Sequence, residues 1–220
     1  MSKKSKLLQL ARKRQEARWV GYKRIGDYCC GAYECDYVSP YTKSANNVHS
    51  KIFVLLQDWS SDSDLSGRFD VDAATIGYTR ASPTNKNLQS LLWHRLEVTL
   101  AQVYVTNLFP FIKMGAMNST IPTKDLLRAA KEFAIPQIEI VKPQLVICLG
   151  LETFNSLRSA CGEKRVNRVV DAVSSKSIFS IGITEVWGQS HPGALGRANR
   201  NKGGVDRVTG DWSAMAKILQ

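Results

Sequence analysis

The feature that most constrains this fold is a series of short apolar runs that alternate with longer amphipathic segments. The runs are IFVLL at 52–56, VYVT at 103–106 and QLVICL at 144–149, and residues 178–190 supply one or two more strands. Uninterrupted apolar runs rich in β-branched residues are typical of strands that are buried on both faces. Because helical segments separate them, we expect a three-layer α/β/α fold with a central, mostly parallel sheet of four strands.

The segments between the strands carry the signals of helices and loops. Leucines recur on one stripe after Thr84, which is a good N-cap residue, and Pro136 predicts a kink or a break in a later helix. The predicted helices cover 3–18, 84–102, 124–141, 152–161 and 211–219. We therefore expect a single domain, in which a basic helix and an irregular segment (1–50) precede an α/β unit (51–220).

The chain carries a formal net charge of +11, and its basic residues gather near both ends. A charge of this size attracts polyanions such as nucleic acid, although a solvated basic surface or a helix on a membrane surface has the same composition. No run of about 18 apolar residues occurs, so no membrane span and no membrane partner are expected. No signal peptide is recognisable, which favours a cytoplasmic location.

The five cysteines raise the question of a metal site. Cys29, Cys30 and Cys35 are clustered, and together with His49 they offer potential ligands for zinc or an iron–sulfur cluster. The paired Cys-x-x-Cys spacing of such sites is absent, however. We therefore expect reduced thiols, no metal and no cofactor.

Polar residues follow three of the predicted strands. Asp58 comes after the first, Asn107 after the second and His191 after the last. Because the carboxyl ends of parallel strands gather at one edge of the sheet, we expect these residues to meet in one crevice. An aspartate can orient a water, an asparagine can read the edge of a base, and a histidine can stabilise an anionic leaving group. Each residue type also has an ordinary structural role, as a helix cap, a turn residue or a packed imidazole.

The segment SHPGALGRANR at 190–200 is the most informative part of the chain. Its histidine is followed by a Pro-Gly turn, an apolar residue and two cations. On a protruding loop, Leu195 can wedge into the base stack of DNA while Arg197 and Arg200 contact phosphates. DNA is therefore the expected partner.

Together these residues resemble the uracil-DNA glycosylase superfamily, over roughly residues 50–200. LLQDW resembles its first motif, with Asp58 at the position of the water-positioning aspartate and Gln57 beside it. TNLFPF is similar to the segment with the base-reading asparagine, and KPQLVICLG to the strand before the last motif. HPGAL at 191–195 resembles the loop with the leaving-group histidine and the wedge leucine.

The first motif departs from the superfamily's pattern. Where the best-known branch has Gly-Gln-Asp-Pro-Tyr, Leu56 replaces the glycine, Trp59 the proline, and Ser60 the tyrosine that excludes a C5 methyl group. The resemblance thus implies a pocket, with Gln57 and Asn107, that admits pyrimidines bulky at C5 unless another residue rebuilds the wall. The candidates for stacking on the flipped base are Trp59, Phe69 and Tyr78.

The resemblance implies a monomeric, monofunctional DNA glycosylase that flips a pyrimidine, hydrolyses its N-glycosidic bond and leaves an abasic site. Its substrate is uracil or a C5-modified pyrimidine, in repair or in attack on modified foreign DNA. No lysine neighbours Asp58 in the sequence, so lyase activity is not expected. One alternative is a DNA-binding protein that keeps the fold without the reaction, which the altered first motif favours and the retained Asp58 and His191 oppose. Another is a nucleotide- or phosphate-binding α/β hydrolase unrelated to DNA.

Overall fold

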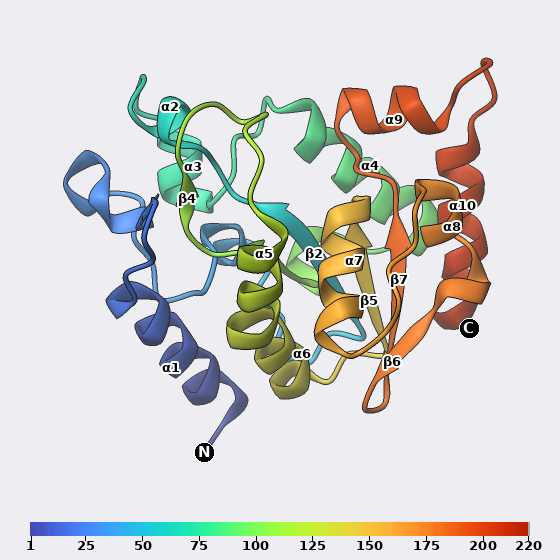
Figure 1. Cartoon of the computed structure of the whole chain (residues 1–220), viewed down its shortest axis with the longest axis horizontal. Helices are drawn as coiled ribbons and strands as arrows, with labels where there is room; N and C mark the ends of the chain where they lie inside the picture. Colours follow the sequence, from blue (N-terminus) through green and yellow to red (C-terminus); the bar gives the residue numbers. More distant parts are fainter. Residues whose placement is uncertain (220) are drawn as a thin grey trace.

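The central sheet has five strands in the order β3-β2-β5-β7-β6, in a computed structural model that describes residues 1–219 (Figure 1). The first four strands in that order are parallel, and β6 is antiparallel to β7. The α/β class and the mostly parallel sheet are thereby confirmed. The strands are β2 (Ile52–Asp58), β3 (Tyr104–Phe109), β5 (Leu145–Leu149), β6 (Phe179–Ile181) and β7 (Thr184–Gln189).

The expected number of four strands is wrong, because residues 178–190 form a hairpin rather than a single strand. Ile181 pairs with Thr184 across a tight turn, and Gly182 in that turn has a φ of 59°. This left-handed conformation suits glycine, which lacks a Cβ. The hairpin therefore adds β6 as a short edge strand beside β7.

Apolar side chains point alternately to the two faces of the sheet, and each face packs against its own helices. On β2, Phe53 and Leu55 belong to one apolar cluster, whereas Val54 and Leu56 belong to the other. The first cluster takes in residues of α1 (Lys3–Glu16), α5 (Thr123–Ala129), α6 (Ile135–Val141) and α7 (Leu151–Ala160), and the second those of α4 (Pro83–Leu96) and α10 (Arg207–Ala216). The sheet thus lies between two helical layers.

The helices differ from expectation where the chain bends or begins a loop. A π-helical turn at Ala130–Ala134 separates α5 from α6 just before Pro136, at the break that the proline predicts. Helix α4 ends at Leu96, earlier than expected, with Glu97 in the left-handed conformation. Four further helices are short and lie outside the predicted ones: α2 (Asp62–Leu65), α3 (Val71–Ile76), α8 (Val169–Ala172) and α9 (Ala194–Arg200). The last of them occupies the stretch around Leu195 that was expected to be a protruding loop.

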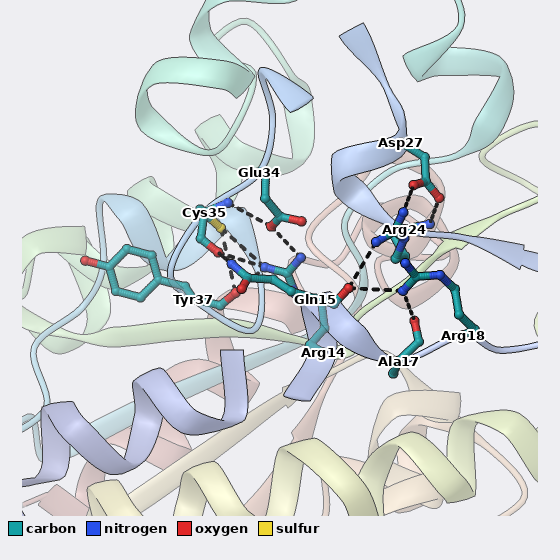
Figure 2. A network of polar contacts seen from close by, with 9 residues as sticks. All are labelled: Arg14, Gln15, Ala17, Arg18, Arg24, Asp27, Glu34, Cys35 and Tyr37. Atoms are coloured by element: carbon teal, nitrogen blue, oxygen red, sulfur yellow. Dashed lines mark hydrogen bonds and ion pairs between the residues drawn. The ribbon is translucent and has the colours of Figure 1, made fainter. Parts of the chain in front are cut away.

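A buried arginine holds the irregular segment 19–50 against the first helix. Arg14 of α1 is fully buried, and its guanidinium pairs with the Glu34 carboxylate at 2.5 Å. It also donates hydrogen bonds to the carbonyl oxygens of Cys35 at 2.9 Å and Tyr37 at 2.7 Å (Figure 2). One cation of the basic helix therefore has a structural role.

The same segment is attached to the α/β unit at two further places. The N–H of Val105 in β3 donates to the carbonyl oxygen of Ala45. Farther back in the chain, β1 (Tyr22–Lys23) pairs in the antiparallel sense with β4 (Ile112–Lys113). Residues 1–50 thus share backbone hydrogen bonds with the residues that follow β2.

Candidate functional site

The three polar residues predicted from the strand ends line one cavity of about 330 Å³. Asp58 is the last residue of β2, and His191 follows β7 by two positions. Asn107 lies inside β3 rather than after it, because pairing between β2 and β3 continues from Leu56–Asn107 to Asp58–Phe109. In Figure 1 the carboxyl ends of the parallel strands point toward the top of the view, where α9 lies.

Two side chains hold the Asp58 carboxylate. Gln57 Nε2 donates to Oδ1 at 3.1 Å, and Lys113 Nζ of β4 lies 2.8 Å from Oδ2. The ammonium is at ion-pair distance but outside hydrogen-bond alignment, so Oδ2 still has capacity to accept a hydrogen bond. Only 4% of the Lys113 side chain and 8% of the Asp58 side chain are exposed. The carboxylate is therefore fixed in orientation, as the positioning of a water requires.

The imidazole of His191 is fixed as a neutral donor. The N–H of Gly193 donates to Nδ1 at 3.1 Å, which assigns the ring proton to Nε2. Burial lowers the pKa of His191 below its ordinary value, while the nearby Asp58 carboxylate opposes that shift. At neutral pH the ring therefore offers Nε2–H to a ligand without carrying a positive charge.

Two glycines allow the chain to fold tightly around this ring. A Cβ on Gly193 would lie 2.9 Å from His191 Nδ1, and a Cβ on Gly196 would lie 2.3 Å from the His191 carbonyl oxygen. Asn87 of α4 secures the same turn by donating to the Pro192 carbonyl oxygen at 2.8 Å. A larger residue at either glycine would displace the imidazole or α9.

Asn107 presents unused hydrogen-bonding capacity to the cavity. Ser39 Oγ donates to Asn107 Oδ1 at 2.5 Å, whereas Nδ2 is buried without a partner among residues 1–219. A buried donor left unpaired costs about 1–3 kcal/mol, so a ligand that accepts a hydrogen bond from Nδ2 recovers that cost. Oδ1 has a second lone pair, and the amide can therefore meet both an acceptor and a donor on one base edge.

Four aromatic rings line the cavity, and only two of them were predicted. Trp59 and Tyr78 are lining residues, as are Tyr33 and Tyr41, and Tyr41 stacks on Tyr78 with 5.1 Å between ring centroids. Phe69, the third predicted ring, is absent from the cavity wall and packs against Tyr33. Phe69 lies in the loop between α2 and α3 and is 44% exposed.

Small and polar side chains complete the cavity wall. Ser60 lines it, next to Trp59 in the chain. Several other lining residues carry hydroxyl or charged groups: Asp64, Arg68, Thr79, Ser82 and Thr84. The walls thus combine aromatic rings with groups that can hydrogen-bond polar substituents of a ligand.

Helix α9 carries the three residues predicted to contact DNA. Their side chains differ in exposure and in the protein groups that they already bind. Leu195 is 75% exposed in the first turn of α9. Arg197 donates to Asn87 Oδ1 at 2.9 Å and is partly exposed. Arg200 forms a two-pronged ion pair with Asp211 at 2.6 Å and 2.8 Å. Arg200 therefore fastens α9 to α10, and a phosphate would have to compete with Asp211 for its guanidinium.

A second cavity, of about 370 Å³, shares Asp58 and His191 with the first. Lys113, Gln57 and Glu152 also line it, together with the loop at 117–121. The carboxylate and the imidazole thus stand where two cavities meet, and a ligand in either one can reach them.

Sequence reasoning missed Ser39, Tyr41 and Lys113. Ser39 and Tyr41 lie in the irregular segment, where no periodicity marks them as neighbours of a strand end. Lys113 follows Asn107 by six positions, in TNLFPFIK. The one signal it offers is a cation soon after the strand that carries Asn107, beyond Pro110.

The cysteine cluster does not form a metal site in the part of the chain that the structure describes. Cys29 and Cys30 are exposed, and Cys35 Sγ donates to the Tyr37 carbonyl oxygen at 3.7 Å. Within residues 1–219, no group of three or more His, Cys, Asp or Glu side chains is placed to hold a metal ion.

None of the helices among residues 1–219 has the length and apolar character needed to cross a membrane. Comparison of the chain with models of known protein families and with curated proteins finds no match.

Proposed function

We propose that this protein is a DNA glycosylase that flips a pyrimidine out of DNA and hydrolyses its N-glycosidic bond, as its resemblance to the uracil-DNA glycosylase superfamily implies. The observation that carries the proposal is the meeting of Asp58, Asn107 and His191 in one cavity lined by aromatic rings. A carboxylate that positions water, an amide that reads a base and a neutral imidazole donor are the parts that this reaction needs.

In the proposed reaction the flipped base lies against an aromatic ring and receives a hydrogen bond from Asn107 Nδ2. The bond from C1′ of the sugar to the base breaks, and its electron pair leaves with the base. His191 Nε2–H donates to the base oxygen on which the negative charge develops. A water held by Asp58 adds to C1′ of the cation-like sugar and gives a proton to the carboxylate, and this proton finally neutralises the released base anion. One preorganised donor of this kind contributes about 3 kcal/mol to transition-state stabilisation.

The substrate that best fits these walls is a pyrimidine with a polar substituent at C5, cleaved at least as well as uracil. Ser60 stands where the resemblance places the aromatic ring that excludes a methyl group, and it lines the cavity. The hydroxyl and charged groups of the wall offer hydrogen bonds to such a substituent.

DNA binding is supported by charge and by the exposed residues near the cavity. The net charge of +11 attracts the phosphate backbone. Leu195 stands exposed on α9, beside the turn that holds His191, where it can fill the gap left by a flipped nucleotide.

The test is abasic-site formation on labelled oligonucleotides that carry uracil, thymine, 5-hydroxymethylpyrimidines or bulkier C5 substituents, in single- and double-stranded form. We expect abasic sites with at least one C5-modified base. DNA binding without abasic sites on any substrate would favour the non-catalytic DNA-binding alternative. Absence of both would favour a hydrolase that acts on nucleotides or phosphates.

A further inference from the structure

We infer that Lys113 is a nucleophile that cleaves the DNA strand after base excision, through a Schiff base with the abasic sugar. The inference rests on the proposed function, because its substrate is the abasic site that base excision leaves. It replaces the expectation of a purely monofunctional enzyme, which followed from the lack of a lysine near Asp58 in the sequence. The fold supplies that lysine from β4.

The position of the amine is the first observation that supports this role. Lys113 Nζ lies 2.8 Å from Asp58 Oδ2 and donates to the carbonyl oxygen of Met117. The side chain is almost completely buried, which is unusual for lysine. It also lines the second cavity, together with Asp58 and His191. The amine is thus held beside the reacting groups rather than extended into solvent.

The identity of its partner is the second observation. Asp58 is the carboxylate that the proposed reaction places beside C1′ of the sugar. A group within 2.8 Å of that carboxylate is close to the same carbon. A lysine that served only to balance charge could pair with any buried carboxylate. This one lines the second cavity and pairs with Asp58, which lines both cavities.

The chemistry needs no reagent beyond water. The abasic sugar opens to an aldehyde at C1′, Lys113 gives a proton to the Asp58 carboxylate, and the neutral amine adds to C1′. One proton of the added amine passes to the former aldehyde oxygen, which becomes a hydroxyl. Asp58 returns the proton to the departing hydroxyl, so water leaves and an iminium ion forms. Asp58 then removes a C2′ proton, and the electron pair expels the phosphate from C3′, which breaks the strand. Water finally hydrolyses the imine, which releases Lys113 and an unsaturated aldehyde on the other fragment.

The experiment supplies a labelled duplex that already contains an abasic site, in the presence of sodium borohydride. Borohydride reduces the imine to a stable amine, so the expected product is a covalent protein–DNA adduct that peptide mapping assigns to Lys113. Lys113→Arg keeps a cation beside Asp58 but lacks the amine, and we expect it to lose both the adduct and strand cleavage.

Lys23→Arg is the matched control. Lys23 also forms an ion pair at 2.8 Å, with Asp62, and it lies on β1, the partner strand of β4. It lines neither cavity, so the control should keep the adduct.

The outcomes separate this inference from the proposed function. An adduct mapped to another lysine or to the terminal amine, or no adduct at all with the wild-type protein, would overturn it whether or not the variants fold. Base excision without an adduct would overturn the lyase step alone. An adduct at Lys113 without excision of any base would support the lyase step and overturn the glycosylase proposal.

Discussion

Asp58 and His191 act mainly on the transition state in the proposed reaction, so their loss should affect turnover more than binding. We expect Asp58→Asn and His191→Ala each to lower single-turnover excision by roughly 100-fold or more, with little change in DNA affinity. Asp72→Asn is a matched control, because Asp72 pairs with Arg80 and does not line the cavity. Equal losses of affinity and turnover would point to misfolding or to a positioning role instead.

Ser60 should decide whether the pocket admits a C5 substituent. A tyrosine at this position puts a ring where the superfamily's excluding aromatic lies, and a C5-substituted base then clashes with it. We expect Ser60→Tyr to lower excision of a 5-hydroxymethylpyrimidine about tenfold relative to uracil, which corresponds to about 1.4 kcal/mol. The exposed Ser66→Tyr, outside the cavity, is the control. No difference between the two bases would mean that Trp59 or Tyr78 already forms the wall.

His191 gives the protein a pH dependence whose direction follows from its pKa. Burial lowers that pKa in the folded state, so the unfolded chain takes up the proton first as the pH falls. The stability that the neutral ring contributes is therefore present above the unfolded pKa of about 6.5 and is lost as the pH falls through the folded value. Protonated Nδ1 also cannot accept from Gly193, so excision should decline over the same range.

The measurement is excision rate and thermal unfolding temperature between about pH 5 and pH 8. We expect His191→Gln to reduce the acid-side loss of stability, whereas the exposed His49→Gln should not. An apparent pKa for excision above the ordinary histidine value would contradict the burial argument.

Helix α9 is the element that we expect to fill the space that a flipped base leaves in the duplex. Leu195 projects from its first turn, and base flipping leaves a space in the stack beside it. We expect Leu195→Ala to lower excision from duplex DNA roughly tenfold, since unstacking costs a few kcal/mol per step and the wedge offsets part of it. Single-stranded substrate should be affected much less. Val205→Ala, another exposed apolar residue, serves as the control, and equal losses on both substrates would argue against a wedge.

At the scale of the whole molecule, the basic helix α1 and the strand ends that carry the cavity lie apart. In Figure 1, α1 lies at the lower left, away from the strand ends that carry the cavity. Several of its cations already contact protein groups: Lys3, Lys13 and Arg14. The basic N-terminal helix is therefore poorly placed to follow DNA that is bound at the cavity.

We expect Lys4→Gln with Arg12→Gln to leave the salt dependence of DNA binding unchanged. Arg68→Gln with Arg197→Gln, at the cavity wall and on α9, should flatten it by about 0.9 in slope for each lost phosphate contact. The measurement is the affinity for one duplex across a salt series for both double variants. A flatter slope for the α1 variant would mean that DNA reaches around to the first helix.

Much of the fold could be predicted from short-range sequence patterns. The features that could not be predicted depend on contacts between residues that are far apart in the chain. The apolar runs predict the parallel strands, and the rule that their carboxyl ends converge predicts the meeting of Asp58 and His191. The predicted number of strands was wrong because, in the sequence, a turn at Gly182 is hard to distinguish from a bend within one strand. The pairing of Lys113 with Asp58 was out of reach because 54 intervening positions carry no pattern that relates them. Side-chain ion pairs of this kind follow from tertiary packing rather than from periodicity.

The hydrogen bond from Ser39 to Asn107 has a consequence for how specificity can change. The amide to which the proposed reaction gives the reading of the base takes its orientation from a residue 68 positions earlier in the chain, in a segment that contributes no strand to the central sheet. Substitutions at Ser39 would therefore alter which hydrogen-bonding groups the amide presents to a ligand, while every strand of the sheet keeps its sequence. Recognition at this site can thus vary separately from the scaffold.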